Sequence, residues 1–210
     1  MVSIVIVKKF TDYNLLPLVN ILFFIMCYFF ISKKYKNPLK SFFLFKTINY
    51  KIIIYSMLVM LGFLIFLAGF NLIFQMPDLL VHKFFADKLK YKFGPLFLLI
   101  EVAVFAPIFE EIIHRGFILR GFIGNYSQKY AIFYSALLFS LFHVNPSQLL
   151  PGFLIGLFFA WIFIRLNNLF YSIIIHSIYN GILTAIGIIY FKKMDFTKNN
   201  YVFEHSIFFP

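Results

Sequence analysis

The chain has 210 residues, of which 62% are hydrophobic and 13% are charged, and its formal net charge is +11. Soluble domains average about 25% charged residues, so this chain has too little polar surface to cover a globule in water. The composition therefore excludes a soluble enzyme, a disordered chain and a small disulfide-stapled fold. It indicates a membrane protein.

Apolar segments long enough to cross a bilayer predict the helices, because a spanning helix needs about 20 mostly apolar residues. These segments are residues 13–32, 52–77, 94–122, 130–164 and 166–191. The fourth is too long for one crossing and contains Asn145-Pro146-Ser147-Gln148 and Pro151-Gly152, so we expect two helices joined by a tight turn there. The expected fold is all-α, a polytopic membrane protein with about six transmembrane helices.

Three parts are expected along the chain. Residues 1–93 form an N-terminal transmembrane region with two spans, residues 94–190 form a core of about four spans, and residues 191–210 form a polar tail. No small-residue cleavage site follows the first span, so we expect that span to be retained. Lysines crowd the loop between the first two spans, which predicts that this loop is cytoplasmic.

The basic residues flank apolar segments, so the positive charge indicates membrane orientation and contact with anionic headgroups of the lipid bilayer. No basic patch is interleaved with aromatic residues, so nucleic acid is not an expected partner. The single cysteine, Cys27, excludes an intramolecular disulfide. The sequence leaves the oligomeric state open.

Ionisable side chains inside apolar spans are costly, by at least about 2.5 kcal/mol each, so they are candidates for function. Of only eight acidic residues, Glu101, Glu110 and Glu111 lie in the third predicted span. Of five histidines, His143 and His176 lie inside uncharged runs. The chemistry of this protein is therefore expected among these groups.

Glu111 and Arg115 are four residues apart and share one helical face, so they can form an ion pair. Glu110 lies about 100° around the helix from Glu111, so we expect the two carboxylates to occupy different environments. A paired Glu111 is suited to a structural role, and an unpaired Glu110 is suited to general acid or base catalysis. The alternative is a salt-bridged helix end at the membrane surface. His114 could face either the pocket or that surface.

Depth in the bilayer decides whether the polar groups can meet. From the helical rise, Glu110, His143, His176 and Asn180 lie roughly 10–20 Å from the cytoplasmic ends of their helices, which predicts one common layer. His176 and Asn180 share a helical face and can both donate hydrogen bonds to one ligand atom. Taken singly, each could instead bond to a neighbouring helix.

Other polar and aromatic residues are expected to have ordinary roles. Glu101 is expected nearer the outer surface, and Trp161 is expected to pack or to anchor the protein at the interface. His82 and His205 are expected to be solvated.

Three motifs in order carry a resemblance to a known family. Glu110-Glu111-x-x-x-Arg115, Phe139-x-x-x-His143 and His176-x-x-x-Asn180 resemble the intramembrane CAAX-protease and bacteriocin-processing family, abbreviated CPBP or Abi. That family includes the Ras-converting CAAX endopeptidase and proteins like lysostaphin resistance protein A. The resemblance covers about residues 94–185, so it makes residues 94–190 the expected catalytic core.

The resemblance implies an intramembrane glutamic endopeptidase that hydrolyses a peptide bond in a membrane-associated peptide or protein. It implies that Glu110 is the general base that activates a water, with His143 helping to hold it. It also implies that His176 and Asn180 stabilise the oxyanion. Glu111 and Arg115 would be the supporting pair.

No cofactor is expected, but zinc stays open. Two histidines and a glutamate occur as ligands in catalytic zinc sites, whereas the short His-Glu-x-x-His pattern of zinc proteases is absent, which favours a metal-independent mechanism. The alternative function is a non-catalytic bacteriocin immunity or membrane binding protein on the same fold. The expected location is a bacterial plasma membrane, crossed several times, with the active site nearer the cytoplasmic side.

Overall fold

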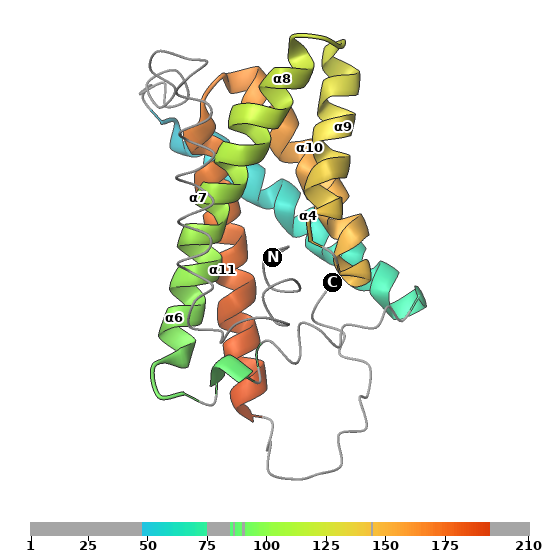
Figure 1. Ribbon diagram of the computed structural model, residues 1–210. Helices are drawn as coiled ribbons and strands as arrows, with labels where there is room; N and C mark the ends of the chain where they lie inside the picture. Colours follow the sequence, from blue (N-terminus) through green and yellow to red (C-terminus); the bar gives the residue numbers. More distant parts are fainter. Residues whose placement is uncertain (1–47, 75–84, 86, 90, 144, 194–210) are drawn as a thin grey trace, which may run out of the picture.

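The computed structural model describes residues 48–74, 85, 87–89, 91–143 and 145–193 (Figure 1). Within these ranges every regular element is a helix and there is no strand, so the expected all-α class is confirmed. Three helices in this part of the chain are long and apolar enough to cross a membrane: Tyr50–Phe74, Pro146–Leu166 and Leu169–Phe191. Six spans stay a prediction. The predicted first span, with Cys27, and also His82 and His205 lie outside the described residues.

The third predicted segment is a continuous stack of five helical pieces. They are α6 (Gly94–Ile100), the π-helix η2 (Glu101–Phe105), α7 (Ala106–Glu111), the π-helix η3 (Ile112–Leu119) and α8 (Arg120–Ile123). At the α-helical rise the stack is about 45 Å long. Two π-helical stretches inside one helix are unusual, and such stretches are frequent at functional sites.

Helices α9 (Gln128–Leu141) and α10 (Leu149–Leu166) form a hairpin through the short 3-10 helix η4 (Pro146–Gln148). Glycine lets the two helices approach closely, since a Cβ at Gly156 would lie 3.1 Å from the Ala136 Cα. The expected turn is therefore present, but Pro151-Gly152 belongs to α10 and not to the turn. Proline is tolerated there because the first turn of a helix has no acceptor for its N–H groups.

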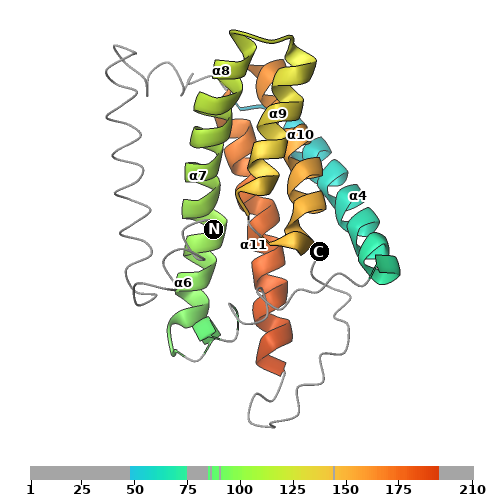
Figure 2. The ribbon, with the colours of Figure 1, turned by 45° about the vertical axis from the view of Figure 1, so that its right-hand side comes forward.

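The α9–α10 hairpin ends well before the lower ends of α6 and α11 (Figures 1 and 2). Its tip, just beyond Leu141, therefore lies part-way along the bundle. At the opposite end, α10 is joined to α11 (Leu169–Lys193) by two residues. Asn167 closes α10 in the left-handed conformation, with φ of 45°, and the Asn168 Oδ1 accepts a hydrogen bond from the Phe170 N–H.

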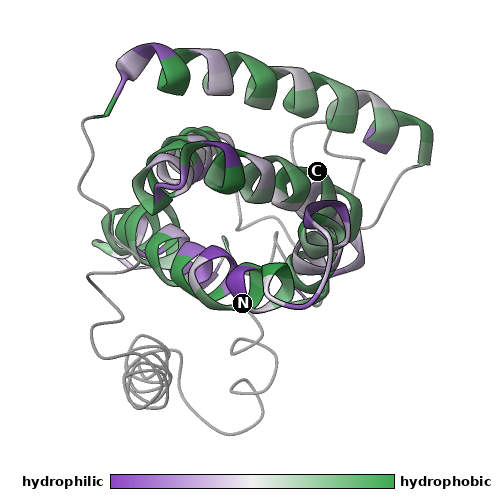
Figure 3. Ribbon diagram, turned by 90° about the horizontal axis from the view of Figure 1, so that it is seen from above, coloured by the Kyte–Doolittle hydropathy of each residue, from purple (hydrophilic) through white to green (hydrophobic). Residues whose placement is uncertain are grey.

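Helix α4 (Tyr50–Phe74) crosses the outside of the bundle obliquely. Seen from above, the stack, α9, α10 and α11 form a ring, and α4 lies outside it (Figure 3). The start of α4 is tied to α11 by a 2.7 Å hydrogen bond from the Asn49 N–H to the Tyr171 hydroxyl. Its buried Met60 joins a cluster with Ile155 and Phe159 of α10. Helix α4 therefore covers the α10–α11 side of the ring.

Candidate active site

Glu111 and Arg115 form an ion pair in the interior of the bundle. The Arg115 Nη1 lies 3.0 Å from the Glu111 Oε1, and both side chains are fully buried. The Arg115 Nη2 donates to the Gly156 carbonyl at 2.9 Å, and the guanidinium lies over the Phe139 and Phe159 rings at 4.6 and 5.5 Å. A buried ion pair needs such additional partners, because both charges have lost their water. The pair fixes the stack against α9 and α10.

The same Glu111 oxygen also binds α11. The His176 Nδ1 lies 3.0 Å from the Glu111 Oε1, so the imidazole N–H donates to a carboxylate that is already neutralised by Arg115. This hydrogen bond directs the other ring nitrogen, Nε2, away from Glu111. Glu111 therefore orients His176 and is itself held by Arg115.

Glu110 is the more accessible of the two adjacent carboxylates. Its side chain is 24% exposed, whereas that of Glu111 is 0% exposed. The Glu110 Oε2 lies 3.9 Å from the His176 Nε2, which is longer than a direct hydrogen bond. The two carboxylates differ in burial, as expected, but they do share a neighbour, since the His176 ring has one nitrogen toward each. Glu110 is thus the carboxylate that water can reach.

His143 follows the last turn of α9, at the tip of the hairpin. Its Nδ1 lies 2.8 Å from the Phe139 carbonyl, and when Nδ1 donates there, Nε2 keeps a free lone pair. The Phe139 ring lies 4.9 Å from the His143 ring and 6.0 Å from the His176 ring. Phe139 therefore connects the two imidazoles across the bundle.

Asn180 lies one helical turn beyond His176 on α11. Its Nδ2 donates to the Val102 carbonyl of η2 at 3.2 Å. The amide thus bridges α11 to the stack, below the contact between His176 and Glu110. Of the four residues expected in one layer, the structure brings Glu110 and His176 face to face, links His143 through Phe139 and sets Asn180 one turn away.

His114 and Glu101 lie in different surroundings. His114 is 3% exposed and points inward, with its ring edge-on to Phe139 and Phe142 at 5.0 and 5.3 Å. Its Nδ1 has no hydrogen-bond partner among the described residues. Glu101 pairs with Lys88 at 2.9 Å and takes no part in the cluster around Glu111.

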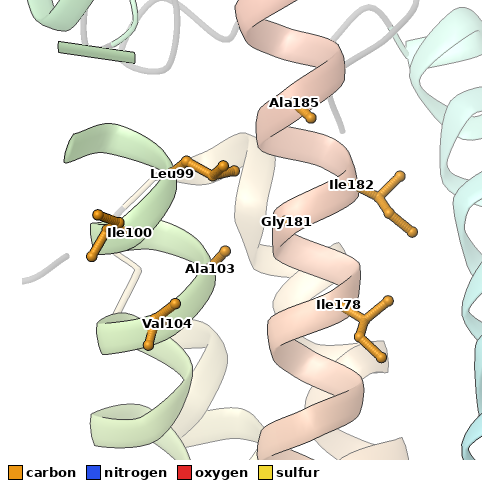
Figure 4. Close-up of a pocket in the computed structure, with 8 residues that line it drawn as sticks. All are labelled: Leu99, Ile100, Ala103, Val104, Ile178, Gly181, Ile182 and Ala185. Carbon is orange, nitrogen blue, oxygen red and sulfur yellow. The ribbon is translucent and has the colours of Figure 1, made fainter. Parts of the chain in front are cut away.

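An apolar groove lies beside the site, between α11 and the lower part of the stack (Figure 4). Its volume is about 470 Å³. Small residues from both helices face each other in it, since a Cβ at Gly181 would lie 3.4 Å from the Ala103 Cβ. At Gly181, the residue after Asn180, α11 therefore approaches η2 closely.

The residue types near Glu110 are ones that can bind zinc, so the distances between them bear on whether a metal ion fits there. Within the described ranges no three side chains from His, Cys, Asp and Glu are grouped closely enough to hold a metal ion. The His176 Nδ1 is instead used in a direct hydrogen bond to Glu111.

Two backbone acceptors in the site were not predicted from the sequence. They are the carbonyls of Gly156, which accepts from Arg115, and Val102, which accepts from Asn180. Side-chain spacing carries no information about backbone carbonyls. Pro107 is the available signal for the second, because a proline inside a helix leaves carbonyls without N–H donors.

The segment that contains this cluster is similar to a known protein family. Residues 92–182 match the family described as type II CAAX prenyl endopeptidase Rce1-like. The match confirms the resemblance that the three motifs predicted, and the Rce1-like region contains every residue of the cluster described above.

A protein of Lactococcus lactis subsp. lactis is similar to part of this chain. The UPF0177 protein YxdF is 34% identical over 80 residues, which cover 38% of this chain and 44% of that protein. The similarity thus spans less than half of the relative's length. No solved structure matches the chain. Together, the membrane-capable helices and the family match indicate a membrane protein with an endopeptidase-like region.

Proposed function

We propose that this protein is an intramembrane endopeptidase in which Glu110 activates a water that attacks the scissile carbonyl. The observation that carries the proposal is the pair of adjacent carboxylates in an Rce1-like region. Glu111 is fully buried and neutralised by Arg115, whereas Glu110 is partly exposed and faces His176. One carboxylate is thus used for structure and the other is left for proton transfer.

In the proposed reaction Glu110 accepts a proton from water while the water oxygen bonds to the carbonyl carbon. The carbonyl oxygen becomes an oxyanion. It receives hydrogen bonds from the His176 Nε2–H, present when both ring nitrogens are protonated, and from the Asn180 amide. Glu110 then gives the proton to the leaving nitrogen, the carbon–nitrogen bond breaks, and a carboxylic acid and an amine are released, after which the acid passes its remaining proton to the amine or to water.

The neighbouring residues support this reaction by holding its donors. Glu111 fixes the His176 ring through Nδ1, and Arg115 fixes Glu111. His143 keeps its Nε2 lone pair free when Nδ1 donates to the Phe139 carbonyl, so it can accept a hydrogen bond from the attacking water. Residues 94–190 are the proposed catalytic core, because all of these groups come from the stack, α9 and α11.

The proposed substrate is a peptide or protein segment associated with the membrane, since the site lies within a bundle of apolar helices. We place the α8–α9 and α10–α11 turns on the cytoplasmic side. The start of α4, α8, the start of α9 and the end of α10 lie near this end of the bundle (Figure 1). These segments carry Lys51, Arg120, Lys129 and Arg165, which is the arrangement that the positive-inside rule favours. A bacterial plasma membrane is the proposed location, and the similarity to a Lactococcus lactis protein supports it.

The proposal is tested by comparing new protein termini in cells that produce the wild-type protein, the Glu110→Gln variant or the Glu101→Gln variant. Glu101 is the matched control, because it is a glutamate of the same stack that pairs with Lys88 outside the cluster. Mass spectrometry of terminal peptides is expected to find the same new termini with wild type and Glu101→Gln, and none with Glu110→Gln. New termini that also arise with Glu110→Gln would contradict the role of Glu110, and the absence of new termini from all three strains would contradict proteolysis and favour a binding or immunity role.

A further inference from the structure

The π-helix η2 changes which backbone carbonyls beside the site receive a hydrogen bond from their own helix. The Ala106 N–H donates to the Glu101 carbonyl, five residues back, instead of to the Val102 carbonyl four residues back. In the same five-residue pattern the next donor, to Val102, would come from residue 107. That residue is Pro107, which has no N–H. The Val102 carbonyl is thus left without a donor from its own helix.

Asn180 supplies the missing donor. Its Nδ2 lies 3.2 Å from the Val102 oxygen, so an orphaned backbone acceptor in an apolar bundle is satisfied by α11. The approach is possible because Gly181 faces Ala103, and a Cβ at Gly181 would already lie 3.4 Å from the Ala103 Cβ (Figure 4). The position of the amide is therefore set by both the free carbonyl and the close packing of the two helices.

The bond also sets which way round the amide lies. A side-chain amide has one oxygen and an NH₂ group with two hydrogens. With one hydrogen on the Val102 carbonyl, the nitrogen end is fixed and the second hydrogen stays available. If the amide were turned over, the Asn180 oxygen would face Val102, and two acceptors would repel each other.

His176 and Asn180 are thus held in the same way, by one hydrogen bond from each side chain to the stack. Each uses one donor on an acceptor of the stack, Glu111 for His176 and the Val102 carbonyl for Asn180. Each keeps one further nitrogen-bound position for another partner. Two groups on adjacent turns of α11 are in this way directed by the stack that carries Glu110.

We propose that Pro107 is a positioning residue, which frees the Val102 carbonyl and thereby orients the Asn180 amide for the oxyanion. The inference rests on the proposed function, because it assigns the free amide hydrogen to the reaction. Replacing Pro107 by alanine supplies an N–H five residues beyond Val102, so in the five-residue pattern of η2 the Val102 carbonyl gains a donor within the stack. Asn180 then shares the Val102 carbonyl with a backbone N–H, which weakens the bond that directs the amide, while every catalytic side chain remains.

The kinetic test uses the Pro107→Ala variant and a peptide that spans a cleavage site identified from the terminal comparison. Loss of one preorganised oxyanion donor lowers kcat by about 10²–10³-fold, so a misdirected donor is expected to lower kcat by at least about tenfold, with KM within about twofold of wild type. The matched control is Pro95→Ala, in the first turn of α6, which is expected to keep the wild-type kcat.

Thermal unfolding separates positioning from a merely structural role. Alanine is a far better residue than proline in a helix interior, so Pro107→Ala is expected to unfold at the wild-type temperature or above it. A fall in kcat together with unchanged or higher stability supports positioning. An unchanged kcat, or a loss of activity that only follows a loss of folded protein, would overturn the inference.

A second readout does not depend on proteolysis. In protein labelled with ¹⁵N-asparagine in lipid nanodiscs, the Asn180 side-chain signal is identified by its loss in Asn180→Asp. One of its two protons is expected to be shifted downfield by the Val102 bond in wild type and Pro95→Ala, and this shift is expected to be lost in Pro107→Ala. Equal shifts in all three proteins would overturn the inference. Absence of cleavage by wild type would overturn the proposed function and the role of the amide in it, but not the orientation of the Asn180 amide by Pro107.

Discussion

Glu111 of α7 and His176 of α11 are joined by a 3.0 Å hydrogen bond between the Glu111 Oε1 and the His176 Nδ1. The acceptor in this bond is a fully buried carboxylate whose charge is balanced by Arg115. The contact therefore depends on an ion pair that has no access to water. It links the stability of the bundle to the orientation of an imidazole that faces Glu110.

The two adjacent glutamates are expected to differ in their effect on stability. Glu111→Gln leaves the buried Arg115 without its counter-charge, and breaking a buried pair costs about 3–5 kcal/mol. Glu110→Gln changes a partly exposed side chain with no partner closer than 3.9 Å among its ion-pair contacts, so it is expected to cost less than about 1 kcal/mol. Chemical unfolding of both variants in detergent micelles checks this. Equal stabilities would contradict the role of Glu111.

Alanine is expected to have opposite effects at two glycines, because Gly156 lies where α9 and α10 approach closely and Gly62 lies in open space. Gly156→Ala forces a Cβ to within 3.1–3.2 Å of Ala136 and Phe139, so it is expected to destabilise the protein by about 1–3 kcal/mol. At Gly62 of α4 an added Cβ meets nothing within 4 Å, and Gly62→Ala is expected to stabilise the helix by up to about 1 kcal/mol. Unfolding midpoints measure both, and shifts of the same sign would count against the packing described.

Two histidines next to Phe139 are expected to respond differently to phenylalanine. His114 packs edge-on between aromatic rings, and its Nδ1 has no partner in the described part of the chain, so His114→Phe should keep both folding and cleavage. His143→Phe removes the proposed acceptor for the attacking water and should lower kcat by at least about 100-fold. Single-turnover cleavage of the identified peptide distinguishes them. Strong loss with His114→Phe and none with His143→Phe would reverse the assignment.

The proposed orientation predicts which loops a membrane-impermeant thiol reagent can reach. In a Cys27→Ser background, a cysteine at Lys129 in the α8–α9 turn should react only after the cytoplasmic side is opened. A cysteine at Lys92, before α6, should react in intact cells. The reverse pattern would mean that the basic end of the bundle faces outward.

Much of this site could be predicted from the sequence, because charged groups in apolar helices are rare and helical spacing is regular. The ion pair of Glu111 with Arg115 follows from a spacing of four residues. The tight hairpin turn follows from Asn145 and Pro146, whereas the place of Pro151 inside α10 depends on where the helix begins, which sequence signals define only to within a few residues.

The contacts of Val102 could not be predicted, for a physical reason. Whether a carbonyl is free depends on the hydrogen-bonding pattern of its own helix, and side-chain periodicity does not report a switch from α to π. The direction of the His114 side chain could not be predicted from the sequence for a related reason. Its inward direction is set by packing against Phe139 and Phe142, which come from a different helix and its end.

The central claim is that Glu110 acts on water without a metal, and cleavage by purified protein in lipid nanodiscs tests it most directly. The peptide is the one identified from the terminal comparison, and the rates of wild type and Glu110→Gln are measured with and without a strong chelator. Wild type is expected to cleave at the same rate in both conditions, and Glu110→Gln is expected to be inactive in both. Cleavage by Glu110→Gln at the wild-type rate, or wild-type activity that chelation removes and zinc restores, would contradict the account.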